Sequence, residues 1–157
     1  MAQELYQGGC TCGQARYQMS RKPMYVHCCH CSWCRKESGA AFGLNGMVEG
    51  NAVEMISGQV EMIDTPTASG RGQTISRCPK CQVALWGNFS KAAQAIHFVR
   101  LGTLDEPRFA PDAHIFTSTK LPWINLDDGI PSFREFYVKS EMWSRESIER
   151  YDDALRK

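Results

Sequence analysis

The 157-residue sequence has no long hydrophobic run, no excess of charge and no repeated or low-complexity segment. Its longest apolar stretch is far shorter than the roughly 20 residues that a transmembrane helix needs, so we expect no membrane partner. The 18 basic residues nearly balance the 17 acidic ones, which argues against a nucleic-acid partner. The first residues lack the basic region and apolar core of a secretion signal. We therefore expect a cytoplasmic protein.

The residues that are present suit a folded domain, because 43% are hydrophobic and 10% aromatic. A chain of this length predicts a single domain over residues 1–157. Segments of β-like composition alternate with turn signals, and they are too short and closely spaced for βαβ crossovers. These segments cover residues 15–19, 24–28, 41–44, 47–48, 53–56, 60–63, 73–77, 83–86 and 96–101. The fold class predicted is mainly β.

Two helices are also predicted. Ser32 is a candidate cap for a short helix that ends at Gly39. Ser144 is a candidate cap for a C-terminal helix with an apolar face. That face contains Ile148, Tyr151 and Leu155. We interpret it as a surface that docks onto the sheet; the alternative is a helix that binds a partner.

Eight cysteines are the informative excess in this composition. Their short-range clustering favours metal ligands over disulfides, which would close longer loops in a secreted protein. Cys10 and Cys12 lie two apart in an extended segment and point to one side. Cys78 and Cys81 form a Cys-x₂-Cys turn like those of zinc ribbons. Together these four predict a closed, tetrahedral structural zinc site that joins the start of the chain to its middle.

The central cysteines differ in number and spacing. Strand alternation places Cys29 and Cys31 on one face, and a following turn returns Cys34 to that face. Three protein ligands leave one position open, as in catalytic zinc sites. The alternative is a second structural site with a fourth protein ligand. The candidates for that ligand are Cys28, His27 and His30. Cys28 is otherwise interpreted as a small buried hydrophobe.

The cysteines belong to a wider set of motifs. These are Gly9-Cys10-x-Cys12-Gly13 with Arg16-Tyr17, Cys29-His30-Cys31-x₂-Cys34-Arg35-Lys36 with Gly39 and Phe42, Cys78-x₂-Cys81, His114-Ile115-Phe116, Lys120, Pro122-Trp123, and Asp128 to Phe133. This combination resembles the family of glutathione-dependent formaldehyde-activating enzymes, which includes the centromere protein V group. The resemblance covers a core of about residues 5–135 and leaves a C-terminal helical extension, about residues 140–157, outside it.

The resemblance implies small curved sheets around a structural zinc, a fold shared with Rab-binding chaperone-like proteins and methionine-R-sulfoxide reductases. It implies two zinc ions per chain and no other cofactor. The structural zinc ligands would be Cys10, Cys12, Cys78 and Cys81, and the second zinc ligands would be Cys29, Cys31 and Cys34. Two departures stand out: Gln82 replaces a glycine usual in the family, and Cys28 adds a rival ligand beside Cys29.

The function predicted is that of a zinc-dependent carbon–sulfur lyase-type enzyme. It would condense a glutathione-like thiol with formaldehyde or another small aldehyde to an S-hydroxymethyl adduct. His30 is a candidate proton shuttle or a structural histidine, and Arg35 a candidate contact for glutathione carboxylates or part of a solvated turn. His97 and His114 are expected to be packed or hydrogen-bonded. Trp33, Trp86 and Trp123 are candidates for a pocket wall, with a place in the core favoured for Trp86 and Trp123. The alternative function is a non-catalytic zinc- or glutathione-binding protein or an interaction module.

Overall fold

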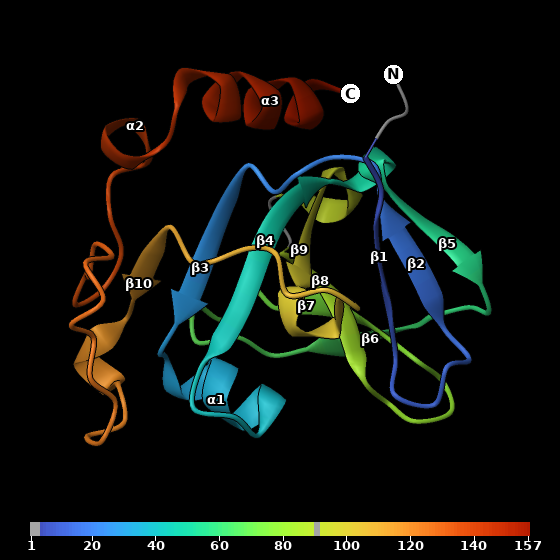
Figure 1. Cartoon of the computed structure of the whole chain (residues 1–157), viewed down its shortest axis with the longest axis horizontal. Helices are drawn as coiled ribbons and strands as arrows, with labels where there is room; N and C mark the ends of the chain where they lie inside the picture. The colour runs from blue at the N-terminus through green and yellow to red at the C-terminus, as the bar shows by residue number, and fades with distance from the viewer. Residues whose placement is uncertain (1–3, 90–91) are drawn as a thin grey trace.

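The framework of the protein is a pair of β-sheets flanked by short helices, in a computed structural model that describes residues 4–89 and 92–157 (Figure 1). The strands are β1 (Tyr6–Gly9), β2 (Arg16–Met19), β3 (Tyr25–Cys29), β4 (Gly43–Glu49), β5 (Val53–Ser57), β6 (Glu61–Thr65), β7 (Gln73–Arg77), β8 (Ala84–Phe89), β9 (Ile96–Arg100) and β10 (Ala113–Ile115). The α-helices are α1 (Ser32–Ser38), α2 (Lys139–Met142) and α3 (Arg145–Arg156). Single-turn 3₁₀ helices cover Gly50–Ala52, Ala93–Ala95, Leu101–Thr103 and Thr117–Thr119. The prediction of a mainly β fold with curved sheets and a C-terminal helix is confirmed.

The larger sheet has seven strands in the order β10-β3-β4-β9-β8-β7-β6, and the smaller sheet has the order β1-β2-β5. The paired strands are antiparallel, except that β10 runs parallel to β3 at the edge of the larger sheet. Neither β1 nor β10 was predicted as a strand from the sequence. Their backbones are nevertheless paired, and β10 places His114 directly beside Cys28.

The core lies on both faces of the larger sheet, because β4 is buried on both sides. Consecutive residues of β4 point to opposite faces. Val48 joins a cluster with Tyr17 and Met19 of the smaller sheet, while Met47 joins a second cluster that includes Trp143 from the C-terminal segment. Cys10 and Cys78 belong to the first cluster and Cys29 to the second. The outer and central cysteines therefore lie on different sides of the sheet.

Helix α3 docks across the larger sheet, as Figure 1 shows at the top of the molecule. The hydroxyl of Ser144 accepts the Ser147 N–H at 3.1 Å, which confirms the predicted cap. Ile148 and Tyr151 pack against the second core cluster, but Leu155 is 43% exposed and does not belong to the buried face. The docking interpretation is therefore confirmed for Ile148 and Tyr151 and wrong for Leu155, which faces solvent.

Two further expectations have different outcomes. Trp86 is buried in the first cluster, but Trp123 is 73% exposed, so its placement in the core was wrong. Trp123 lies in a loop after the 3₁₀ turn at Thr117–Thr119, and most of its side chain faces solvent. In the described part of the chain, no helix is long and apolar enough to cross a membrane.

Candidate metal centres and pocket

The outer cysteines meet where two tight turns face each other. Their four Sγ atoms lie within 4.8 Å of one another. The Cys10 and Cys12 sulfurs are 3.5 Å apart, and the Cys12 and Cys78 sulfurs 3.7 Å. Four sulfurs about 2.3 Å from a zinc ion would stand about 3.8 Å apart in a tetrahedron. The spacing therefore fits a zinc ion bound by Cys10, Cys12, Cys78 and Cys81.

Backbone hydrogen bonds shape both turns. The Ala15 N–H donates to the Cys10 sulfur at 3.3 Å. In the second turn, the Gln82 N–H donates to the Cys78 carbonyl at 2.9 Å. A hydrogen bond from the Val83 backbone is the main cause that lowers the pKa of Cys81 to about 5. Such N–H donors stabilise thiolates, which are the ligand form of cysteine.

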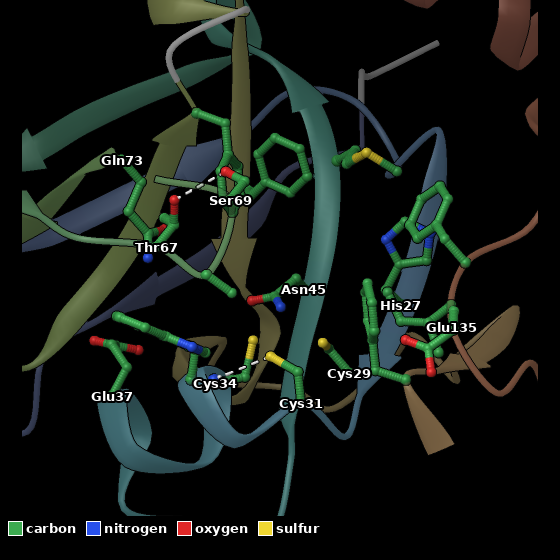
Figure 2. A pocket seen from close by; sticks show the side chains of 18 of the residues that line it. His27, Cys29, Cys31, Cys34, Glu37, Asn45, Thr67, Ser69, Gln73 and Glu135 are labelled. Atoms are coloured by element: carbon green, nitrogen blue, oxygen red, sulfur yellow. Dashed lines mark hydrogen bonds between the residues drawn. The ribbon is translucent and has the colours of Figure 1, made fainter. Parts of the chain in front are cut away.

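The central cysteines come together at the junction of β3 and α1. Cys29 ends β3, Cys31 is the cap of α1, and Cys34 lies in its first turn. The Cys34 N–H donates to the Cys31 sulfur at 3.2 Å, so Cys31 fills the cap position that the sequence analysis gave to Ser32. The three sulfurs lie within 4.8 Å of one another. Figure 2 shows them pointing toward one another below Asn45.

The electrostatics of the central group favour a bound cation. Hydrogen bonds from Cys29 and Cys34 lower the pKa of Cys31 to about 2. The thiols of Cys31 and Cys34 raise the pKa of Cys29 far above its ordinary value. One thiolate therefore forms readily, while the next is opposed by the negative charge beside it. A divalent cation would remove that opposition, so this donor set fits a metal ion.

A pocket of about 630 Å³ opens beside these three thiols. Volumes of this size suit small-molecule ligands. The lining includes Arg100, whose guanidinium donates to the Asn45 side-chain oxygen and pairs with Glu37 at 3.3 Å. Glu37 also pairs with Arg77 at 2.5 Å. These contacts fix Arg100 at the pocket wall. Neighbouring Cys31 raises the pKa of the Cys34 thiol, and the positive charge of Arg100 lies close enough to oppose that rise.

A second wall comes from the C-terminal segment. The Trp143 indole N–H donates to the Tyr137 hydroxyl at 2.7 Å, and that hydroxyl contacts Nε2 of His27 at 2.5 Å. Because the Tyr137 oxygen accepts the Trp143 N–H, the hydroxyl proton of Tyr137 points to His27. Burial lowers the pKa of His27 to about 4, so this ring is neutral at pH 7 and accepts that proton. The three side chains hold one another at the pocket surface.

The remaining cysteine belongs to a third group on the other face of β3. The Cys28 sulfur lies 3.5 Å from Nε2 of His30, and the same nitrogen lies 3.0 Å from Nδ1 of His114. Nε2 of His114 lies 2.7 Å from an Asp128 carboxylate oxygen. The Cys28, His30 and His114 side chains are all buried. Strand alternation thus separates Cys28 from the central thiols.

The structure brings the predicted ligands together in two groups, but it places the two predicted helper residues elsewhere. Neither His30 nor Arg35 is among the pocket-lining residues in the described part of the chain. The His30 side chain is fully buried, and the backbone N–H of His30 donates to the Ile115 carbonyl at 2.9 Å. Asn45 and Arg100 were not predicted as pocket residues. They occupy adjacent strands, β4 and β9, at a directly paired position that only the sheet register reveals.

The fold and these cysteine groups define a class: mainly β proteins with thiol clusters that fit metal ions. A comparison with protein families matches residues 5–119 to the family described as glutathione-dependent formaldehyde-activating enzyme. The chain belongs to this family. No curated protein matches the sequence.

Among solved structures, the chain is similar to a crystal structure of a Rhodobacter sphaeroides protein from a structural genomics programme. The two sequences are 14% identical. The match covers 81% of this chain and 98% of the other, with a TM-score of 0.45. The assignment to the family rests on the sequence match.

Proposed function

We propose that this chain is a zinc-dependent carbon–sulfur lyase-type enzyme that joins a glutathione-like thiol to formaldehyde or another small aldehyde. The observation that carries the proposal is the convergence of Cys29, Cys31 and Cys34 at the edge of a 630 Å³ pocket. Three protein ligands leave a coordination position for a substrate. Membership of the family supports the choice of a thiol and an aldehyde as reactants.

The two metal-binding groups have different roles in this proposal. Cys10, Cys12, Cys78 and Cys81 would hold a structural zinc, and the central three a second zinc. The structural ion would link Cys12 to Cys78, which are 66 positions apart. A link that closes so long a loop should contribute several kcal/mol to stability.

In the proposed reaction a sulfur–carbon bond forms, the carbonyl π bond opens, and the carbonyl oxygen gains the proton that the thiol lost. Zinc in the central group would lower the pKa of a substrate thiol bound in its fourth position. Arg100 has a buried Nε with no hydrogen-bond partner among the described residues. Arg100 lines the pocket, and its positive charge beside Cys34 would stabilise the developing oxyanion. Glu37 and Asn45 hold the guanidinium in place.

Neither helper residue predicted from the sequence acts in the pocket in this proposal. We assign His30 a structural role that positions the end of β3 against β10. Its backbone N–H donates to Ile115 of β10, and its ring contacts His114 rather than the pocket. Arg35 has no role in the proposed reaction.

Zinc analysis of dialysed protein tests the two-site proposal. The wild type should contain two ions per chain. Cys34→Ser should lose one ion and stay folded, whereas Cys81→Ser should lose the structural ion and much of its stability. Cys28→Ser is the matched control, because its sulfur lies on the other face of β3, and it should keep both ions. A single ion in the wild type would sink the proposal.

Exchange NMR tests turnover. Added protein should speed the exchange between formaldehyde and its glutathione adduct, and Cys34→Ser should abolish the acceleration. Unchanged exchange together with retained glutathione binding would favour a carrier over an enzyme.

A further inference from the structure

The lining of the pocket is mostly apolar. Aromatic side chains from β8, β9 and the C-terminal segment form much of its surface, together with Met47 of β4. The charged residues in the lining are Glu37, Arg100, Glu135 and Lys139, two of each sign. A tripeptide thiol with more than one carboxylate would find no excess of positive charge here.

The two cations of the lining are already engaged. Arg100 is held between Glu37 and Asn45. The Lys139 ammonium lies 4.0 Å from the centre of the Tyr151 ring and 3.7 Å from an Asp152 carboxylate oxygen. A ligand carboxylate would have to displace these contacts, so the pocket favours a reactant without one.

Among the described residues, two buried side-chain polar atoms of the lining have no hydrogen-bond partner. They are Nε of Arg100, a donor, and Oε1 of Gln73, an acceptor, and both are buried. A Cβ on Gly87 would lie 3.1 Å from that Gln73 oxygen and 3.7 Å from the Arg100 Nη2. The two side chains therefore meet above this glycine. Together they give the pocket a polar corner with a guanidinium donor and an amide acceptor, which suits a hydroxyl group because a hydroxyl can both accept and donate.

Across the pocket from this polar corner lies an aromatic wall, formed by Phe136, Tyr137, Trp143 and Tyr151 of the C-terminal segment. Phe136 stacks on Tyr137 at 4.6 Å, and Trp143 meets Tyr151 edge to face at 5.5 Å. These aromatic residues lie beyond residue 119, where the family match ends. In Figure 2 the three sulfurs lie between Gln73 on one side and His27 and Glu135 on the other. The reacting atoms would thus lie between a polar corner and an aromatic wall.

We infer that one of the two reactants carries an aromatic group, attached by a short linker to the reacting sulfur or carbon. This inference rests on the proposed function for its reaction class and narrows the substrate class. The aryl group packs against Phe136 and Trp143, and the hydroxyl of the adduct contacts Arg100 and Gln73. The thiol sulfur bonds to the carbonyl carbon, and the thiol proton ends on that hydroxyl, so the reaction needs no oxidant or reductant.

The first experiment compares three reactant pairs by exchange NMR on the zinc-containing full chain. These are glutathione with formaldehyde, glutathione with phenylacetaldehyde, and benzyl mercaptan with formaldehyde. We expect one aryl-bearing pair to be accelerated at least tenfold more than the first pair, relative to the uncatalysed exchange. The second pair places the aryl group on the aldehyde, and the third places it on the thiol. Acceleration of the first pair that equals or exceeds both others overturns the inference.

The second experiment measures binding without reaction. Phenethyl alcohol carries an aryl group and a hydroxyl but cannot form the adduct, and the fluorescence of Trp143 and Trp33 reports its binding. Phe136→Ala should weaken this binding about tenfold, the value of one good aromatic contact. It should also slow the aryl-bearing pair at least fivefold more than the formaldehyde–glutathione pair. Trp123→Ala, an equally drastic change at an exposed site outside the pocket, should alter neither.

The two experiments separate the inference from the proposed function. Phe136-dependent binding of phenethyl alcohol without acceleration of any pair would refute the enzyme proposal and leave the ligand class standing. Acceleration of the glutathione–formaldehyde pair without binding of phenethyl alcohol would do the reverse.

Discussion

Gln82 adopts a left-handed backbone conformation, with a φ of 62°, directly after the last outer cysteine. A side chain normally disfavours this region because its Cβ approaches the neighbouring carbonyl. The turn needs the conformation, since the Gln82 N–H bonds the Cys78 carbonyl while the Cys78 N–H bonds the Val83 carbonyl. The Gln82 amide partly compensates by donating to the Pro79 carbonyl at 3.2 Å.

Replacement of Gln82 by glycine should therefore stabilise the protein. Glycine adopts this φ without a steric cost, although it also makes the unfolded chain more flexible. We expect the free energy of unfolding to rise by about 0.5–1 kcal/mol, measured by urea titration of the metal-loaded protein. Gln82→Ala is the matched control, because it loses the amide but keeps the Cβ, and it should be no more stable than the wild type. Equal gains in both variants would contradict the strain argument.

At the residue scale, spacing predicted much of the candidate site. Alternation along β3 correctly separated Cys28 and His30 from Cys29 and Cys31, because residues on a strand point to opposite faces regardless of tertiary context. The cap was assigned one residue late, because a cysteine sulfur took the role usually filled by a hydroxyl or carboxylate. Arg100 and Asn45 escaped prediction, since their contact depends on the pairing of β9 with β4.

At the element scale, an ion pair anchors α3 to the larger sheet. Arg150 contacts both carboxylate oxygens of Glu49 at 2.7 Å, and its guanidinium also donates to the Lys22 carbonyl. Burial opposes ionisation of Glu49, but the hydrogen bonds from Arg150 and Arg21 hold its pKa below the ordinary value. The Ser147 hydroxyl adds a bond to the Met24 carbonyl at 2.7 Å.

Loss of this anchor should loosen α3 and the aromatic wall together. Arg150→Met removes the charge but keeps an apolar side chain, and it leaves the buried Glu49 carboxylate with Arg21 alone. We expect a loss of about 2–4 kcal/mol in unfolding free energy and faster amide exchange in residues 139–156. The control is Arg156→Met, which breaks an exposed pair with Asp153 and should cost under about 1 kcal/mol. Equal losses in the two variants would count against an anchoring role for Arg150.

Not every element was equally predictable. The C-terminal helix followed from its cap and its apolar spacing, which are local signals. Strand β10 has only three residues and is a strand because it pairs in parallel with β3, so its local sequence does not predict it. The aromatic wall likewise depends on how residues 133–151 fold back over the sheet. A sequence of scattered aromatic residues does not reveal which of them share one surface.

At the scale of the whole molecule, the larger sheet is covered on both faces and buries ionisable groups within it. His97 of β9 stacks on Trp86 at 5.2 Å, and its Nδ1 lies 2.7 Å from the Asn88 amide nitrogen. An acceptor nitrogen is unprotonated, so the folded state holds this ring neutral. Burial lowers the pKa of His97 to about 4.

Global stability should therefore fall on acidification. Below a pH of about 6.5 His97 is protonated in the unfolded chain, whereas in the folded chain it stays neutral down to about pH 4. The free energy of unfolding therefore rises with pH across that window. His97 contributes at most about 1.4 kcal/mol per pH unit. Urea titrations at pH 7.5 and 5.5 should show a smaller pH effect in His97→Phe, which keeps the ring stack. An unchanged pH effect would show that other groups control it.

The separation of the thiol groups from the aromatic wall has a consequence for diversification. The cysteines occupy the matched segment of residues 5–119, while much of the wall lies after it. Mutations after residue 119 can thus change which molecule fits beside the sulfurs without altering how the sulfurs are held. Chimeras that exchange residues after 119 between family members, or libraries randomised only there, would test which ligands fit beside an unchanged set of thiols.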